Sequence, residues 1–249
     1  MTPLSASLDW GGVDAVLFDL DGVITPTAEV HMHAWAEMFT PFLADRQVAA
    51  YTDEDYFAHV DGKPRYDGVA ALLAARGIEL PWGDPGDEPD ATTVCGLGNR
   101  KNLLFGVVLA RDGVTAFPGS VELLDVLDAR GTRMAVVSSS ANAPDVLRAA
   151  GLLERFETVV DGAVATEQGL PGKPRPDTYE YAAEVLGVPH ERAVVVEDAL
   201  SGVQAGAAGS FAAVVGVDRG AGADALLGHG ADVVVEDLAE LVAGARESS

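Results

Sequence analysis

The stretch A-V-L-F-D-L-D-G-V-I-T-P, residues 15 to 26, decides which fold the rest of the chain is expected to adopt. Its apolar start runs directly into Asp19 and Asp21. A continuous apolar run is typical of a strand buried on both faces, as in a parallel sheet. Ligands of open α/β sheets bind beyond the carboxyl ends of the strands, which is where the two aspartates lie. Gly22 then permits a sharp turn.

Two interpretations of this acidic pair stay open on the aspartates alone. Two carboxylates so close together repel each other, and a magnesium ion held by oxygen ligands would relieve that repulsion. The alternative is a strand followed by an acidic surface turn, and two aspartates by themselves do not separate the two cases.

Composition restricts the class of protein. The chain has 249 residues, 48% of them hydrophobic, which allows one large domain, with or without an insertion, and a sizeable core. No apolar run is long enough to cross a membrane. The segment Met1 to Trp10 has neither a basic start nor an apolar centre, so we expect no secretory signal. The single cysteine, Cys95, excludes an intrachain disulfide and a multi-cysteine zinc site and favours a reducing cytoplasm.

The formal net charge of −23 excludes two kinds of partner. So acidic a surface repels nucleic acid and anionic membranes. Only 16 residues are Lys or Arg, so a site for an anionic small molecule must concentrate a few of them. We therefore expect a small-molecule substrate. We also expect a monomer rather than an obligate oligomer.

The first part of the chain predicts one strand and then only helices. We expect a loose tail over residues 1–12, a strand over Val13–Asp19 and an exposed loop rich in Pro, Gly and Asp over 79–93. Thr27 is the expected N-cap of the first helix. The main helices are expected over Ala28–Thr40, Tyr66–Arg76 and Leu97–Arg111.

After a turn at Phe117–Gly119, helices and strands alternate, which predicts a doubly wound, Rossmann-like parallel α/β sheet. The helical stretch then interrupts this domain as an insertion. We expect residues 1–27 and 118–249 to form the α/β core and residues 28–117 to form an all-helical cap. The later strands are expected over Arg133–Val137, Thr158–Val160, Ala193–Val196, Ala212–Val215 and Asp232–Val235.

Polar residues follow other predicted strands as well. Ser138 follows one strand, Glu197 and Asp198 follow another, and Lys173 lies in the loop G-K-P. Taken singly they could be a helix cap, an acidic helix start and a solvated cation. Strand ends of a parallel sheet face one crevice, however, so we expect one cluster of six side chains. These are Asp19, Asp21, Ser138, Lys173, Glu197 and Asp198.

Such a cluster suits phosphoryl transfer, which depends mostly on positioning and on charge stabilisation. Asp19 could attack phosphorus and form an aspartyl phosphate. Ser138 and the amides after it could hold the phosphoryl oxygens, and Lys173 would neutralise charge. The side chain of Asp21 could act as general acid and base, a role worth ~10²–10⁴ in rate.

The same cluster contains the oxygen ligands that Mg²⁺ prefers. Asp19, Asp198 and Glu197 are the candidate carboxylate ligands, and the backbone carbonyl of Asp21 completes the set. Bound Mg²⁺ would offset the repulsion between a carboxylate nucleophile and a phosphate.

In this arrangement the chain resembles the haloacid dehalogenase-like phosphotransferase superfamily from Val13 onward. The motifs occur in order: D-L-D-G-V at 19–23, Ser138 after a strand, Lys173 in G-K-P-R-P-D, and E-D at 197–198. The resemblance implies Asp19 as nucleophile and Asp21 as acid and base. It separates the chain from the dehalogenases, which lack the second aspartate and need no metal.

The inserted segment resembles the cap of the β-phosphoglucomutase-like subfamily. The stretch T-P-T-A-E-V-H-M-H-A-W, residues 25–35, matches the start of that cap. This implies that His31 links cap closure to the acid/base aspartate, and it adds Thr27 and Trp35 as substrate-binding residues. Without the resemblance, His31 would be assigned to an exposed helix face and Trp35 to the core.

Two further cap segments resemble phosphate-binding segments of that subfamily. The stretch G-K-P-R-Y-D at 62–67 points to Arg65, and G-N-R-K-N at 98–102 points to Lys101. Either cation could be solvated, but a phosphate role is more credible in so acidic a chain.

The core loop S-S-A-N implies that Ser140 and Asn142 bind the same, non-transferring phosphate. The family mutases carry a lysine between these two positions, where this chain has Ala141. Lys63 could supply the missing charge.

The favoured hypothesis is a Mg²⁺-dependent phosphosugar mutase that interconverts β-glucose 1-phosphate and glucose 6-phosphate. A sugar-phosphate phosphatase that uses Asp19 with water as acceptor is the alternative. A non-catalytic sugar-phosphate sensor is disfavoured, because Asp19, Asp21, Lys173 and Asp198 are all present.

Overall fold

The computed structural model describes residues 8–60 and 63–247 and divides the chain into two compact units. Met1–Pro26 and Val114–Ser249 form one, here called the α/β unit, and Thr27–Gly113 form the other, here called the helical unit. Residues 114–117, expected in the insertion, belong to the α/β unit, where the Phe117 amide donates to Ile24 O at 2.9 Å. No helix in the described ranges has both the length and the apolar character to span a bilayer.

The sheet of the α/β unit confirms the predicted fold class. It has six parallel strands in the order β3-β2-β1-β4-β5-β6, with β1 next to β2 and β4. This is the doubly wound order of nucleotide-binding folds. The register places Phe18 beside Val136 and Val196, so the segments after these strands begin at one level. The strands are β1 Ala15–Phe18, β2 Arg133–Val137, β3 Thr158–Val160, β4 Ala193–Glu197, β5 Ala213–Val217 and β6 Val233–Val235.

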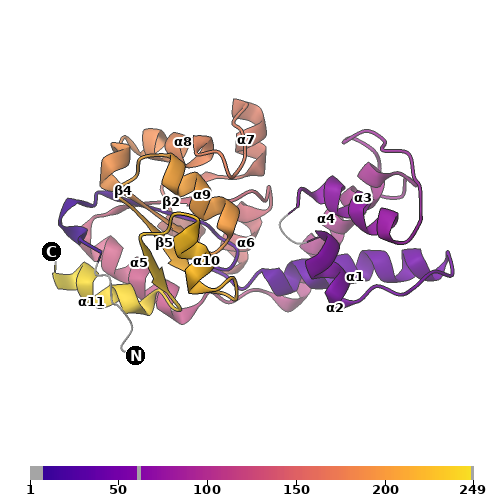
Figure 1. The fold of residues 1–249 in the computed structure, drawn as a ribbon, viewed down its shortest axis with the longest axis horizontal. Helices are drawn as coiled ribbons and strands as arrows, with labels where there is room; N and C mark the ends of the chain where they lie inside the picture. The colour runs from indigo at the N-terminus through magenta and orange to yellow at the C-terminus, as the bar shows by residue number, and fades with distance from the viewer. Residues whose placement is uncertain (1–7, 61–62, 248–249) are drawn as a thin grey trace. The chain divides into compact units, whose positions relative to one another are not determined.

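Helices cover both faces of this sheet (Figure 1). Helices α8 and α9 lie on one side, where Ala15 and Leu17 of β1 join their core, and α5 and α11 lie on the other. The helices are α5 Pro118–Arg130, α6 Ala143–Ala149, α7 Gly162–Gln168, α8 Asp177–Leu186, α9 Leu200–Ala208, α10 Ala223–Gly228 and α11 Ala239–Glu247.

The helical unit has a core of its own, in which α1 packs against α4. Its described residues contain no strand, as expected. A short helical turn and a π-helix, neither of them predicted, precede α3. The elements are α1 Ala28–Ala44, α2 Asp53–Asp55, the π-helix η2 Tyr56–Val60, α3 Arg65–Ala75 and α4 Val94–Asp112.

Two expectations about chain segments were wrong. Trp10–Gly12 is a 3₁₀ turn (η1), not part of a loose tail, because the Trp10 side chain is buried and Arg130 Nη2 donates to its carbonyl at 3.0 Å. The remaining tail positions, 1–7, lie outside the described residues. The turn expected at Phe117–Gly119 is instead the start of α5, since Pro118 occupies the first helical position, where its missing N–H costs nothing.

One expectation about a helix end needs correction, and one helix was missed. Thr27 stands at the N-cap of α1, but its backbone is helical and its side chain makes no capping bond. An N-cap side chain reaches the next amides only from an extended backbone. Helix α7 was not predicted. It is short and begins after Asp161, whose Oδ1 accepts from Ala163 N at 2.9 Å and Val164 N at 2.8 Å.

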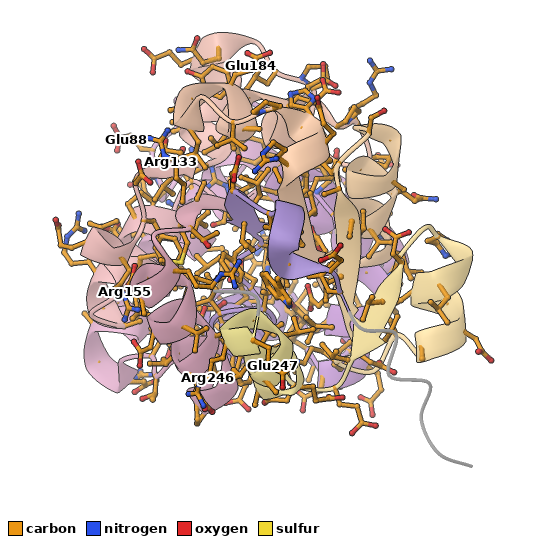
Figure 2. The ribbon with its side chains drawn as sticks, turned by 90° about the vertical axis from the view of Figure 1, so that its left-hand side faces the viewer. Glu88, Arg133, Arg155, Glu184, Arg246 and Glu247 are labelled. Carbon is orange, nitrogen blue, oxygen red and sulfur yellow. The ribbon has the colours of Figure 1, made fainter. Side chains whose placement is uncertain are left out.

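Much of the limited positive charge of the α/β unit is used at its surface. Figure 2 labels Arg133, Arg155 and Arg246, and each of them pairs with a carboxylate. Such exposed pairs contribute little to stability. Because these arginines are paired with acidic neighbours, a cation buried away from the surface is a better indicator of a binding site.

Candidate active site

One buried ammonium group joins the ends of three central strands. Lys173 Nζ donates to Asp19 Oδ1 at 2.5 Å, to Glu197 Oε1 at 2.7 Å and to Val137 O at 3.0 Å. Asp19 follows β1, Val137 ends β2 and Glu197 ends β4. The side chains of Lys173, Asp19 and Glu197 are 8%, 11% and 1% exposed. The predicted convergence of strand ends therefore occurs around Lys173.

Glu197 is held from three directions. Its Oε1 also accepts from Tyr179 OH at 3.1 Å, and its Oε2 accepts from Ala199 N at 2.9 Å. A Cβ on Gly202 would lie 1.6 Å from Oε1, so only glycine fits beside this carboxylate. Tyr179 was missed because nothing in the sequence of α8 indicates that its hydroxyl reaches Glu197.

The pKa shifts show an excess of negative charge. Burial raises the pKa of Asp19 well above its usual value against the pull of Lys173, and the carboxylates of Glu197, Asp198 and Asp21 raise it further. Burial, Glu197 and Asp21 raise the pKa of Asp198 to about 8. Burial opposes the charge on Lys173, but Asp19 and Glu197 outweigh it and hold its pKa well above the usual value. The ammonium of Lys173 pairs with two carboxylates, and Asp198 and Asp21 add two more negative charges near them.

This charge imbalance fits a divalent cation with oxygen ligands. Carboxylate oxygens of Asp19, Glu197 and Asp198 lie within 4.8 Å of one another. Both oxygens of Glu197 already accept hydrogen bonds, so Asp19 and Asp198 are the better placed ligands. Gly22, with a positive φ of 84°, passes so close that a Cβ there would lie 2.0 Å from Asp198 Oδ2.

The loop after β2 is organised by its own hydroxyl groups. Ser138 Oγ accepts from Ser140 N at 3.1 Å, and Ser140 Oγ accepts from Asn142 N at 3.2 Å. Ser138 is buried, and together with Lys173 it lines a cavity of about 230 Å³. Ser138 therefore lies with the other strand-end residues.

Three of the predicted residues in the helical unit form one cluster. Lys101 Nζ lies 2.7 Å from His31 Nδ1, and it sits 5.1 Å from the ring centre of Trp35 and 4.9 Å from that of Phe105. The His31 ring stacks on Phe105 at 4.4 Å. Burial and the Lys101 ammonium lower the pKa of His31 well below its usual value. The imidazole is thus neutral and accepts from Lys101 at Nδ1.

The predicted phosphate-binding arginine is part of a separate network. Arg65 Nη2 donates to Tyr66 OH at 3.1 Å and to Asn99 Oδ1 at 3.3 Å, while its Nε is buried without a hydrogen-bond partner. Asn99 Nδ2 in turn donates to Pro85 O at 3.0 Å and Asp87 O at 2.8 Å. The loop over 79–93 is thereby tied to Arg65. The sequence predicted neither the contact between Arg65 and Asn99 nor the contact of Asn99 with this loop.

Comparison with known proteins identifies the family. A family model described as a haloacid dehalogenase-like hydrolase matches residues 13–209. The chain is 50% identical over 242 residues to a β-phosphoglucomutase of Mycobacterium bovis, with 92% of each chain covered. It is 32% identical to a β-phosphoglucomutase of Bacillus subtilis, covering 91% of this chain and 94% of the relative.

The fold of a solved structure is also similar to that of this chain. A mutant of CbbY from Rhodobacter sphaeroides, in complex with xylulose-(1,5)bisphosphate, superimposes with a TM-score of 0.72 at 26% identity, covering 93% of this chain and 98% of the other. The chain therefore belongs to the haloacid dehalogenase-like hydrolase family, as an enzyme of its phosphotransferase type in the β-phosphoglucomutase-like subfamily.

Proposed function

We propose that this enzyme is a Mg²⁺-dependent mutase that interconverts β-glucose 1-phosphate and glucose 6-phosphate through an aspartyl phosphate. The observation that carries the proposal is the contact of Lys173 with both Asp19 and Glu197 beside Asp198. Half of the residues are identical to those of a β-phosphoglucomutase over nearly the full chain, which supports the sugar phosphate as substrate. Location in the cytoplasm and a monomeric state stay predictions from the sequence.

Each proposed step is assigned to a side chain. Asp19 attacks phosphorus, and Lys173 offsets the negative charge that would otherwise repel the phosphoryl group. Ser138 and the following amides bind the phosphoryl oxygens. Asp21 protonates the leaving sugar oxygen and later deprotonates the attacking hydroxyl. Mg²⁺, held by Asp19, Asp198 and the Asp21 carbonyl, supplies further charge neutralisation when bound.

A mutase must also hold the phosphate that is not being transferred. We assign this phosphate to Arg65 and Lys101, with Ser140 and Asn142, because a planar guanidinium grips phosphate oxygens in pairs. We assign His31 to the link between cap closure and the acid/base group, and Thr27 and Trp35 to substrate binding. Arg65 donates to the neutral groups of Tyr66 and Asn99 in this structure, so a phosphate would offer it a stronger, charged partner.

A product assay tests the reaction. The enzyme is incubated with β-glucose 1-phosphate, Mg²⁺ and a trace of glucose bisphosphate, and glucose 6-phosphate and free phosphate are measured. A mutase yields glucose 6-phosphate in large excess. Release of free phosphate alone would replace the mutase with the phosphatase that uses the same Asp19.

The variant Arg65→Ala separates the two phosphate positions. Losing one charged hydrogen bond costs about 1.5–3 kcal/mol, so mutase flux should fall by roughly one to two decades. Hydrolysis of a small phosphomonoester, which has no second phosphate, should hardly change. The control is Arg100→Ala, which removes an arginine of the same unit that bonds Pro89 O at 2.7 Å. An equal loss of both activities in Arg65→Ala would assign Arg65 to the transferring phosphate or to folding.

A further inference from the structure

The turn that carries Asp21 is tethered from outside through three consecutive carbonyl groups. Within the turn, Gly22 N donates to Thr25 O at 2.8 Å. The carbonyls of residues 22, 23 and 24 then each accept from a different donor. These donors are Arg219 Nε to Gly22 O at 2.8 Å, Ser120 Oγ to Val23 O at 2.7 Å and Phe117 N to Ile24 O at 2.9 Å.

Arg219 is the one charged side chain among these three donors, and it makes more than one contact. Its Nη1 donates to Glu236 O at 3.1 Å, and its guanidinium carbon lies 3.9 Å from the ring centre of Phe117. A flat guanidinium can stack on an aromatic ring and donate along its edge at the same time. A lysine ammonium cannot reproduce that combination.

The backbone that presents Arg219 is itself fixed. Asp218, the residue after β5, accepts at Oδ1 from Gly220 N at 2.9 Å and from Gly222 N at 3.0 Å. These backbone hydrogen bonds lower the pKa of Asp218. Arg219 therefore extends from a closed turn toward Gly22.

The backbone at Gly22 also has little room to move, because it lies against Asp198. Its positive φ and the 2.0 Å that would separate a Cβ from Asp198 Oδ2 place it directly against the acidic cluster. A shift of this peptide must therefore move Asp21, the residue before it, relative to Asp198.

We propose that Arg219 is a positioning residue that fixes the orientation of Asp21 by donating to the Gly22 carbonyl while its guanidinium stacks on the Phe117 ring. The inference rests on the proposed function, in which Asp21 is the general acid and base. Arg219 itself does not touch the reacting atoms. Its loss should therefore harm only those phosphoryl transfers whose leaving group needs a proton.

The experiment compares two aryl phosphates in single-turnover mixtures with excess enzyme and Mg²⁺. An activated nitrophenol leaves without a proton, whereas an unactivated phenol needs one. Arg219→Ala and Arg219→Lys should release the activated phenol within about twofold of the wild-type rate. Release of the unactivated phenol should fall by about tenfold to a hundredfold, part of the general-acid contribution. Arg133→Ala, which removes an exposed arginine of the same unit, should behave as wild type.

The outcomes distinguish this inference from the proposed function. Asp21→Asn should show the same selective loss, and adding Arg219→Ala to it should cause no further selective loss. If Asp21→Asn is selective and Arg219→Ala slows both phenols equally or neither, Arg219 has a merely structural role or none. If Asp21→Asn is not selective, or the wild type releases neither phenol, the proposed acid/base chemistry itself is wrong.

Discussion

Asp19, the proposed nucleophile, lies in surroundings that disfavour its negative charge. Its pKa is raised above the value in an unfolded chain, so the folded protein binds the proton more tightly. Through this group, stability is highest at low pH and falls as the pH rises above about 4.

We therefore predict that Asp19→Asn abolishes turnover yet stabilises the metal-free protein at neutral pH. A neutral amide cannot attack phosphorus, and it removes one charge from a crowded cluster. Urea denaturation of the EDTA-treated protein at pH 7.5, beside an activity assay, checks both parts. Substantial residual turnover in this variant would contradict a covalent mechanism.

His31 predicts an opposite dependence on pH. Burial and Lys101 hold the pKa of His31 well below 6.5. The folded state therefore binds a proton at His31 more weakly than the unfolded chain does. Its contribution to stability is complete above about pH 6.5 and is lost as the pH falls below that value. Urea denaturation at pH 7.5 and 5.5 should show a smaller loss in His31→Gln than in wild type. The control is His33→Gln, an exposed histidine on the same helix, which should keep the wild-type loss.

Among the short elements, the turn α2 depends on a partly buried ion pair. Asp55 Oδ2 accepts from Thr52 N at 2.9 Å and from Arg76 Nη2, and Arg76 also donates to Ala49 O and Ala50 O, each at 3.1 Å. Burial works against the charge on Asp55, but the bonds from Arg76 and Thr52 outweigh it and lower its pKa. This stability is therefore present at neutral pH and is lost when Asp55 is protonated in acid.

We predict that Asp55→Asn costs about 1.5–3 kcal/mol at pH 7, the range for a hydrogen bond to a charged group. The loss should shrink toward pH 3, because the unfolded wild-type chain then takes up a proton that the folded carboxyl, with its lowered pKa, binds more weakly. Chemical denaturation at the two pH values measures it. Asp53→Asn, at an exposed position of the same turn, should change little, and an equal loss there would assign the effect to net charge.

The elements also show how far sequence reasoning reaches. The strands were predicted within a few residues, because apolar runs such as A-V-L-F bury both faces in a parallel sheet. The strand-end positions of Asp19 and Glu197 followed from that topology, and Lys173 was expected beside them from the loop G-K-P. Tyr179 and Arg219 did not, since their contacts depend on helix rotation and on loop conformation. The contact between His31 and Lys101 joins residues 70 apart and has no local signal.

For the molecule as a whole, the net charge of −23 complicates any test for Mg²⁺. Any salt screens repulsion among surface carboxylates, so added MgCl₂ would stabilise the protein even without a site. Binding of Mg²⁺ at a specific site increases the free energy of unfolding further. This increase grows with the Mg²⁺ concentration and reaches about 2.7 kcal/mol at a hundredfold excess over Kd. The two effects can be separated by matching ionic strength.

We predict that MgCl₂ stabilises the wild type more than NaCl of equal ionic strength, with an increment that saturates. Asp198→Asn should lose the saturating increment and keep the screening effect, because only the carboxylate near Asp19 changes. Asp237→Asn is the matched control, since it also removes one negative charge from the α/β unit. Thermal denaturation across a MgCl₂ titration measures both effects. An increment that persists in Asp198→Asn, or that NaCl reproduces in the wild type, would exclude this cluster as the metal site.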